Sequence, residues 1–339
     1  MVAEDYHANR QRGSIRGTAG GQTPPPGNDM TTMMNAVQVS KFGGTDVLEW
    51  VELEQPRPGP NEVLVEIACA GVGPWDAWIR AGKSVLPQPL PLIPGSDIAG
   101  TVVELGEGVT DFAIGDRVFG VTNPRFTNGY AQFASAHAGM IAKMPDGMSF
   151  ARAASMPVIA VTAWQMLHDF ARVAPGQRVL VYGGAGNVGA YAVQLGRIAG
   201  AFIVATASQK DLDRVRQSGA QEVVERSQSL DAYTGTFDVV IDTVGGNALA
   251  TCYPLIRRGG VIVSIVEKPD ADRVASREAR ADFLLVSVNT MTLARLAEWV
   301  MTGQLETCIG EELPLREARL AHQMIEGLQH RPGKILLVP

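Results

Sequence analysis

The first half of the chain has the pattern of short strands separated by dense turns. Apolar and polar residues alternate over Val63–Ala70, and shorter apolar runs occupy Ala36–Val39, Ala99–Leu105 and Arg117–Val121. Proline and glycine punctuate the stretches between these runs, most densely from Pro87 to Gly95. Regular short strands with such turns predict an all-β, barrel-like unit that begins at about residue 35.

From about Thr162 the pattern changes to strands that alternate with helices. Strands are predicted at Arg178–Tyr182, Phe202–Ala207, Glu222–Glu225, Val239–Asp242, Val261–Val266 and Leu284–Val288. Helices are predicted at Val188–Ala199, Leu212–Ser218, Ala248–Leu255 and Leu293–Met301. This alternation is typical of an α/β, doubly wound parallel sheet with helices on both faces. An amphipathic helix at Leu315–Gly327 and a strand at Lys334–Val338 are predicted for the tail.

Composition narrows the class of protein. Hydrophobic residues make up 46% of the chain and charged residues 19%, which is enough apolar material for large cores. The formal net charge of −6 argues against sequence-independent nucleic-acid binding, which needs a basic surface. Cys69, Cys252 and Cys308 are too far apart for a disulfide framework, so we expect reduced cysteines and a cytoplasmic protein.

Two segments could be mistaken for membrane or targeting signals. Val179–Gly196 has 18 uncharged residues, but its five glycines and its change from strand-like to helix-like pattern argue against a membrane span. Residues 1–34 contain a Pro24–Pro26 run and no apolar core, so they are not a secretory signal. We expect a disordered N-terminal extension there, or a start codon placed too early.

A glycine-rich loop carries the strongest chemical signal. The residues that fit the G-x-G-x-x-G pattern are Gly184, Ala185, Gly186, Asn187, Val188 and Gly189. They follow a predicted strand and open a predicted helix, which is the setting of a dinucleotide site. There Gly184 would allow the tight turn, Gly186 the approach to a pyrophosphate and Gly189 the packing of helix on strand. The alternative is a glycine-rich turn without a ligand.

The end of the second strand indicates which nicotinamide cofactor binds. An NAD site usually places an acid there to accept the ribose 2′-hydroxyl, whereas this chain has no acid before Asp211. Ser208, Lys210 and Arg226 would suit a 2′-phosphate, so we predict NADP(H). The alternative is that Lys210 and Arg226 are ordinary surface charges.

An ordered set of motifs resembles a known family. It comprises Val39–Gly44, Ala70–Asp76, Ile93–Gly100, Gly115–Val118, Thr162–Trp164, the glycine loop, Asp242–Gly246 and Gly333–Ile335. It resembles the medium-chain dehydrogenase/reductases, most closely their zinc-independent quinone oxidoreductase (zeta-crystallin-like) branch. The resemblance implies a GroES-like β-barrel domain over residues 35–157, completed by 303–339, and a Rossmann NADP-binding domain over 158–302.

Departures from the zinc-dependent members concern the metal. Those members place a Cys near Gly73 and a His-Glu pair near Ser96 and Asp97, and this chain has neither. We therefore expect no metal. The quinone oxidoreductases commonly have Asn at the Gly73 position and Tyr at the Trp78 position, so their usual polar contacts are missing here.

The resemblance also gives candidate site residues. The candidates for the catalytic pocket are Asp76, Trp78, Ser96, Tyr130 and Thr162, and those for the cofactor beyond the glycine loop are Thr243, Val244, Ser264, Val266 and Lys334. The structural alternatives are that Asp76 caps a helix, that Tyr130 closes a turn and that Trp78 belongs to the core. His137 and His168 are expected to be surface or core residues. No proton donor is identified beyond water or a cofactor hydroxyl.

The predicted reaction is hydride transfer from NADPH to a quinone or another conjugated carbonyl, because such acceptors delocalise the incoming charge without zinc. An enoyl-thioester reductase and a non-catalytic nucleotide-binding protein are the alternatives. The predicted partners are a small-molecule substrate, with no nucleic acid and no membrane, and a second copy of the chain. The apolar run Phe283–Val288 would lie near the sheet edge and pair in a homodimer, unless the N-terminal tail or a loop covers it.

Overall fold

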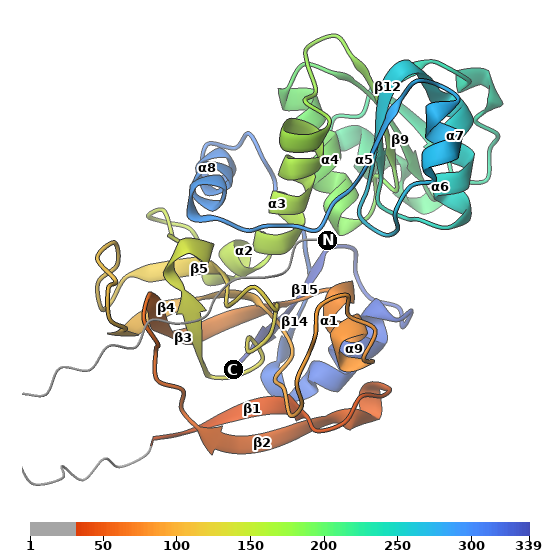
Figure 1. Cartoon of the computed structure of the whole chain (residues 1–339). Coiled ribbons are helices and arrows are strands. Elements are labelled where there is room, and N and C mark those ends of the chain that lie inside the picture. Colours follow the sequence, from red (N-terminus) through yellow and green to blue (C-terminus); the bar gives the residue numbers. More distant parts are fainter. Residues whose placement is uncertain (1–31) are drawn as a thin grey trace, which may run out of the picture. The chain divides into compact units, whose positions relative to one another are not determined.

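The computed structural model describes residues 32–339, and Met33–Pro339 form one compact unit (Figure 1). The predicted N-terminal extension over residues 1–34 therefore lies outside the described residues except for its last three. Its boundary needs a correction, because β1 already begins at Met33 and Met34 is buried.

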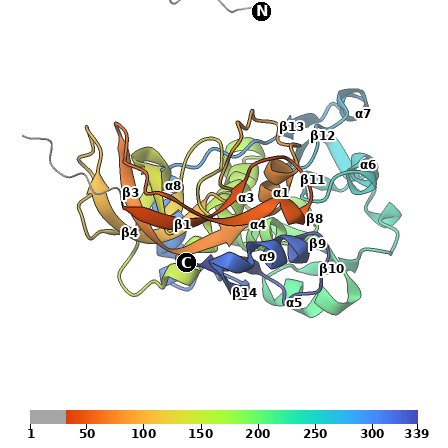
Figure 2. The same cartoon turned by 90° about the horizontal axis from the view of Figure 1, so that it is seen from below.

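The barrel half is built from antiparallel strand pairs, except that the last two strands of the chain pair in parallel. Strands β1 (Met33–Val39) and β2 (Leu48–Glu54) form a two-stranded ribbon. A seven-stranded sheet has the order β14-β15-β3-β4-β5-β7, with β6 paired to β3. Its strands are β3 (Glu62–Val72), β4 (Asp97–Leu105), β5 (Arg117–Val121), β6 (Phe133–His137), β7 (Ile141–Lys143), β14 (Ile309–Pro314) and β15 (Lys334–Val338). The tail thus completes the sheet of the first half, and α9 (Ala318–Ile325) contacts β14 (Figure 2).

Two short helices interrupt the predicted all-β region. They are α1 (Pro74–Arg80), whose first residue is a proline, and α2 (Phe150–Ala154), capped by the Ser149 hydroxyl. Proline at the first helical position costs no hydrogen bond, which makes it a good start signal. The sequence indicates α1 only through the alternative role of Asp76 as a cap, and α2, with five residues, is too short for a periodic pattern.

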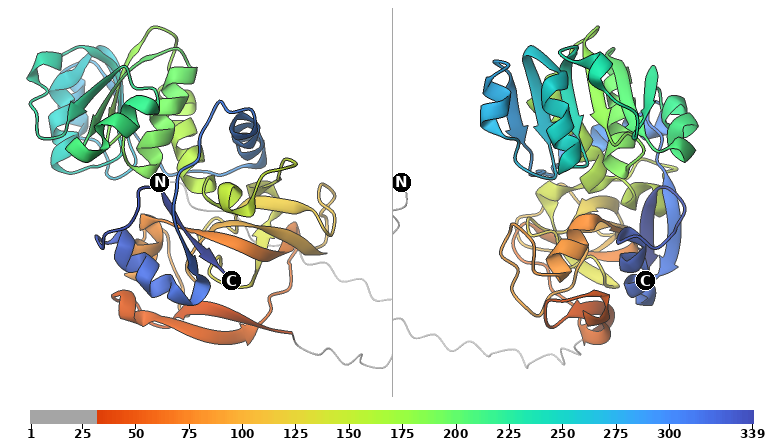
Figure 3. Two further views of the ribbon diagram at one scale, coloured as in Figure 1. Left: turned by 180° about the vertical axis from the view of Figure 1, so that it is seen from behind. Right: turned by 90° about the vertical axis from the view of Figure 1, so that its right-hand side faces the viewer.

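The second half contains the predicted parallel sheet, with strand order β10-β9-β8-β11-β12-β13. The strands are β8 (Arg178–Tyr182), β9 (Phe202–Ala207), β10 (Glu222–Glu225), β11 (Phe237–Asp242), β12 (Ile256–Ser264) and β13 (Arg280–Phe283). Helices α4 (Asn187–Ile198) and α5 (Leu212–Gln217) pack on one face, and α6 (Asn247–Cys252) and α7 (Ala271–Ala275) on the other (Figure 3). The α/β prediction, with a barrel and a doubly wound sheet, is confirmed.

The predicted strand at Leu284–Val288 is wrong. The edge strand is β13, four residues earlier, and residues 284–289 continue without strand pairing. Leu284 N–H still bonds to Ser264 C=O on β12 (2.9 Å), but beyond it the side-chain amide of Gln165 accepts from Ser287 N–H (3.1 Å) and donates to Ser287 C=O (2.8 Å) in place of a strand partner. The hydrophobic pattern does not predict β13 because this strand is charged. Its Arg280–Asp282 ion pair, with an N–O distance of 3.1 Å, suits an exposed sheet edge.

One apolar core links the barrel to the parallel sheet. Helix α3 (Pro157–Trp164) is apolar on all sides and lies in a buried cluster that reaches from Phe119 on β5 to Val181 on β8. It packs on α4, and α8 (Thr290–Met301) packs on it in turn. A helix that is apolar all round is typical of a fully buried element.

A buried ion pair fixes where α3 begins. The Lys334 ammonium lies 2.7 Å from the Asp97 carboxylate, and both side chains are fully buried. The other Asp97 oxygen accepts from Val158 N–H at the start of α3 (3.1 Å). The Trp75 ring lies 4.4 Å from the same ammonium. This group therefore joins β15, β4, α1 and α3.

A second buried carboxyl anchors α1. The Asp76 carboxyl accepts from Gly73 N–H (2.9 Å) and from the Tyr130 hydroxyl (3.0 Å), and both side chains are fully buried. The helix offered as an alternative is therefore present, but it begins at Pro74 with Gly73 as its N-cap. Asp76 is its third residue and bonds back to the N-cap, so it is not the cap itself. Burial raises the pKa of Asp76 to about 7, although the Gly73 hydrogen bond and the Lys334 charge act in the opposite direction.

We predict that Lys334→Met destabilises the protein by about 3–5 kcal/mol, because Asp97 is left as a buried carboxylate with no cation to neutralise it. Urea unfolding measures the change. The matched control is Lys143→Met, which breaks an exposed pair with Asp116 (2.9 Å) and should cost less than about 1 kcal/mol. Equal losses in the two variants would contradict the structural role given to the buried pair.

We also predict that Asp76→Asn changes how stability depends on pH. The folded carboxyl binds a proton more tightly than the unfolded one, whose pKa is 3.8, so the wild-type protein loses stability as pH rises from about 4 to about 7. Asparagine keeps an acceptor for Gly73 N–H and carries no charge, so the loss over this window should be smaller. Urea unfolding at several pH values tests this, with the exposed Asp146→Asn as control. An unchanged slope in Asp76→Asn would be the contrary result.

Candidate functional site

The glycine loop connects β8 to α4, and its backbone turns at a different residue from the one predicted. Gly183 has the left-handed φ of +90°, and Gly186 N–H bonds back to Gly183 C=O (3.0 Å). The tight turn therefore belongs to Gly183, one residue before the predicted Gly184. A Cβ at Gly184 would instead lie 2.8 Å from that of Ala205 on β9.

The start of α4 is open to a ligand. Gly186 is its N-cap, is exposed, and has no side chain to block the first N–H groups of the helix. A Cβ at Gly189 would collide with the Gly183 carbonyl oxygen, so this glycine allows the close packing predicted for it. Free N–H groups and the positive end of the helix dipole suit the pyrophosphate of a dinucleotide.

A cavity of about 380 Å³ lies beside this loop, at the carboxyl ends of the parallel strands. Its lining includes the predicted residues Ala185, Gly186, Ser208, Arg226 and Val244. It also includes residues that were not predicted: Tyr182, Gly183, Thr206, Ala207, Asp211, Asn247, Ala248 and Thr251. Lys210 is exposed and does not line it. The cavity gathers the ends of β8, β9, β10 and β11, where an open α/β sheet binds its ligand.

Asp211 alters the electrostatics expected here. It ends a single 3-10 turn (Gln209–Asp211) that folds its carboxylate back into the cavity. Its two oxygens accept from the Ser208 hydroxyl (2.5 Å) and from Arg214 (2.8 Å). Burial acts to raise the pKa of Asp211, but these two hydrogen bonds, together with the charges of Arg214 and Lys210, hold the pKa below its ordinary value. The sequence suggested that no acid lies at the end of β9. The structure places the Asp211 carboxylate there, paired with Ser208 and Arg214.

The loops after β11 and β12 present an apolar surface. Val244 is 50% exposed and Val266 is 38% exposed. The buried Asp242 carboxylate accepts from Val244 N–H and Gly245 N–H (both 3.0 Å) and from the Ser264 hydroxyl (2.7 Å). Ser264 is therefore turned inward, where it holds a loop instead of facing a ligand. The Thr243 hydroxyl is likewise bonded to Tyr182 C=O (2.8 Å).

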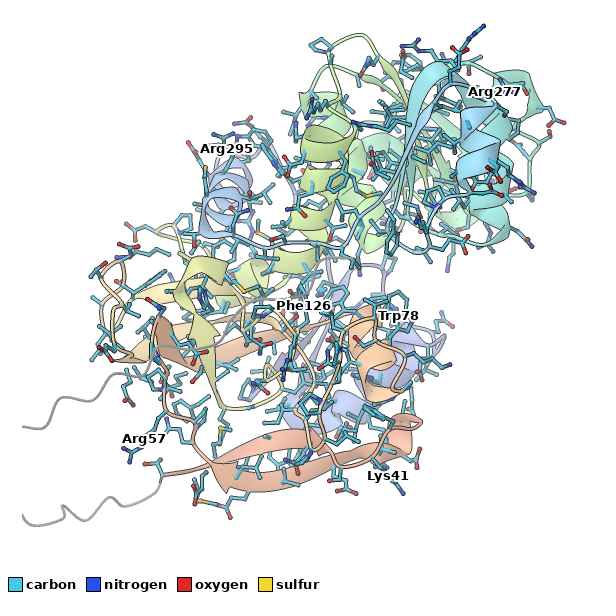
Figure 4. The ribbon with its side chains drawn as sticks, viewed as in Figure 1. Lys41, Arg57, Trp78, Phe126, Arg277 and Arg295 are labelled. Atoms are coloured by element: carbon cyan, nitrogen blue, oxygen red, sulfur yellow. The ribbon has the colours of Figure 1, made fainter. Side chains whose placement is uncertain are left out.

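Most polar groups predicted for catalysis are also turned inward. Asp76 and Tyr130 hold one another in the core, and the Thr162 hydroxyl donates to Val158 C=O (2.6 Å). Ser96 is fully buried, and its hydroxyl has no partner among the described residues. Trp78 differs, because it lies on α1 with 46% of its surface exposed (Figure 4).

Lys334 and the two histidines lie elsewhere. Lys334 was predicted to contact the cofactor, but its ammonium is buried against Asp97, so we correct that assignment to a structural one. His137 is exposed and accepts from Gly139 N–H. His168 stacks on Trp164 with the ring centroids 4.0 Å apart, and burial lowers its pKa.

Phe126 is a residue that sequence reasoning missed. It is half-buried, packs against both the barrel core and the core around α3, and has a φ of +59° (Figure 4). A bulky residue in the left-handed region is strained, and such strain gathers at binding sites. Nothing in the sequence around Phe126 signals this conformation.

The residues at the zinc positions of the metal-dependent relatives do not fit a metal ion. Gly73 has no side chain to offer, Ser96 is buried, and Asp97 is committed to Lys334. Within residues 32–339 no three His, Cys, Asp or Glu side chains come together as a metal site. Over the same residues, no helix has both the length and the apolar character needed to cross a membrane.

Comparison with known proteins agrees with this geometry. Residues 59–162 match the family model for the alcohol dehydrogenase GroES-like domain, and residues 218–337 match the model for zinc-binding dehydrogenases. The chloroplastic quinone-oxidoreductase homolog of Spinacia oleracea is 31% identical over 91% of this chain and 99% of its own length. The quinone oxidoreductase of Homo sapiens is 30% identical over 90% and 98%.

Solved structures agree as well. The quinone oxidoreductase of Coxiella burnetii has a TM-score of 0.85 and 31% identity, covering 91% of this chain and all of its own. A mycobacterial protein complexed with NADPH has a TM-score of 0.81 and 27% identity, covering 90% of this chain and all of its own. These similarities cover both the barrel and the parallel sheet. The chain belongs to the quinone oxidoreductase branch of the medium-chain dehydrogenase/reductases and is an NAD(P)-dependent oxidoreductase.

Proposed function

We propose that the protein is a zinc-independent, NADPH-dependent reductase of quinones or other conjugated carbonyls. The observation that carries this proposal is the inward turn of the polar side chains. The polar atoms of Asp76, Tyr130 and Thr162 are hydrogen-bonded inside the fold. The side chains of Trp78 and Val266, in contrast, are exposed. A site without a free acid or a metal donor set suits an acceptor that delocalises the incoming charge by itself.

The residues then have simple roles. A bound nicotinamide cofactor supplies the hydride. The first N–H groups of α4 hold its pyrophosphate, and Val244 and Val266 give its nicotinamide an apolar wall. Asp242 keeps that wall in place through the backbone of Val244 and Gly245. Trp78 offers a flat apolar surface to an aromatic substrate.

Cofactor choice is supported by Arg226, which lines the cavity and is exposed at the end of β10. A guanidinium suits the 2′-phosphate of NADPH. One relative of the same fold is a protein complexed with NADPH. Together these points favour NADPH over NADH.

The alternative reactions have less support. An enoyl-thioester reductase needs a tyrosine donor, but the Tyr130 hydroxyl is buried and donates to Asp76. A purely structural nucleotide-binding role is not favoured by any feature of the site. We also propose that residues 33–157 with 303–339 form the substrate domain and 158–302 the cofactor domain, a division that sheet membership supports. The cytoplasm remains the proposed location, because the three cysteines are free.

We predict that the purified protein oxidises NADPH with small quinones and enones, and much more slowly with simple ketones and enoyl thioesters. Loss of NADPH absorbance measures the rate for each acceptor. The activity should survive exhaustive chelation, because residues 32–339 bring no donor set for zinc together. Faster turnover of simple ketones, or activity that chelators abolish, would contradict the proposed reaction.

Variants test the apolar wall. Val266→Glu should lower kcat/KM with quinones by about tenfold or more, because the nicotinamide would then face a charge. Ile114→Glu is the control, since Ile114 is 68% exposed in the turn before β5 and touches none of the residues assigned to the site. Equal kcat/KM in Val266→Glu and wild type would count against this wall.

We also propose a homodimer formed at the sheet edge, with its contact moved from a strand to the extended residues after β13. Leu285 is 59% exposed there, next to an edge strand. Light scattering at micromolar concentration should give a dimer for wild type and a monomer for Leu285→Lys. Met291→Lys is the control, since Met291 is 76% exposed on α8. A monomeric wild type, or a dimer that Leu285→Lys leaves intact, would refute the contact.

A further inference from the structure

The acid in the cofactor cavity is held by a built arrangement of hydrogen bonds. Asp211 is 15% exposed, and each of its oxygens has its own donor, Ser208 on one side and Arg214 on the other. Arg214 also donates to the carbonyl oxygen of Ala185, in the glycine loop (3.0 Å). Its guanidinium is therefore fixed between the loop that would hold the pyrophosphate and the acid that faces the ribose pocket.

The charge of Asp211 matters because of its position. It lines the same cavity as Ser208 and Arg226, which come from the ends of β9 and β10. A carboxylate there accepts the 2′-hydroxyl of NADH and repels the 2′-phosphate of NADPH. An uncompensated Asp211 would oppose the cations that favour NADPH.

Arg214 reduces the repulsion between Asp211 and a 2′-phosphate. Its charge neutralises Asp211 at 2.8 Å, and the Ser208 hydroxyl occupies the second oxygen. Lys210 adds to the positive field and contributes to the low pKa of Asp211. The carboxylate thus has neither a free oxygen for a ribose hydroxyl nor its full charge toward a phosphate.

We propose that the Asp211–Arg214 pair determines the choice between NADPH and NADH. Arg214 neutralises the Asp211 carboxylate and so permits a 2′-phosphate to bind. When Arg214 is replaced by a neutral residue, the carboxylate can accept the ribose 2′-hydroxyl and favours NADH. This inference rests on the proposed function only in that a nicotinamide cofactor binds in this cavity. Asp211 and Arg214 are specificity-determining residues, and neither takes part in hydride transfer.

The chain supplies a matched control on the same helix. Arg216 and Asp213 form the same i, i+3 ion pair at 2.7 Å, but both are exposed and neither lines the cavity. A change that acts only through helix stability or through net charge should appear equally at Arg216. A change that acts through the cavity should appear only at Arg214.

The test measures the dissociation constants of NADPH and NADH by titration calorimetry, without turnover, for four proteins. These are wild type, Arg214→Gln, Asp211→Asn and the control Arg216→Gln. We expect Arg214→Gln to shift the NADPH/NADH preference about tenfold or more toward NADH, and Asp211→Asn to shift it about tenfold toward NADPH. Arg216→Gln should match wild type.

The two variants are expected to shift the cofactor preference in opposite directions. A pair that only stabilised the loop would not produce such opposite shifts. If Arg214→Gln weakens both cofactors equally, or Asp211→Asn leaves the preference unchanged, the pair does not select and the proposal is overturned. Asp211→Asn decides the matter even if Arg214→Gln fails to fold. If wild type binds neither cofactor, the proposed function fails together with this inference, whereas binding with an unmoved preference refutes this inference alone.

Discussion

The buried Lys334–Asp97 ion pair is the interaction on which the arrangement of the site depends. A single charge in this core would be very costly, and the pair is tolerated because its atoms find partners on both sides. Asp97 holds the first turn of α3 through Val158 N–H, and α3 packs on α4, whose first turn carries the glycine loop. One carboxylate on a barrel strand thereby fixes the helix that positions the cofactor loop.

Two other buried carboxyl groups also fix a segment of the fold by accepting hydrogen bonds from backbone N–H groups. Asp76 holds the start of α1, and Asp242 holds the loop after β11, each through backbone N–H groups. Both residues are fully buried, so their oxygens hold backbone N–H groups of the fold and do not face a ligand. The surface left for the ligand is consequently formed by backbone and apolar side chains, such as Gly186 and Val244.

The sequence predicted the parallel sheet well and the polar site poorly. The prediction of Arg178–Tyr182 is exact, because an apolar run that starts at a charged residue and stops before a glycine has clear ends. The run Leu284–Val288 is similarly apolar but is not a strand, since the Gln165 side chain, distant in sequence, takes the hydrogen bonds of Ser287 in its middle. Asp211 was discounted because it lies beyond the strand end, and only the turn at Gln209–Asp211 returns it to the cavity. Hydrogen bonds from residues distant in sequence, and a short turn that reverses the chain, leave no periodic pattern in the sequence.

The pairing of β15 with β3 has a consequence for how the chain is made. The parallel sheet draws all its strands from one continuous stretch, so it can assemble as soon as that stretch leaves the ribosome. Strand β3 is made early, but its apolar end at Ala70–Val72 waits for Ile335–Leu337, and Asp97 waits for Lys334. The barrel is thus begun first and closed last. Its open edge is the surface that a nascent-chain chaperone would have to shield.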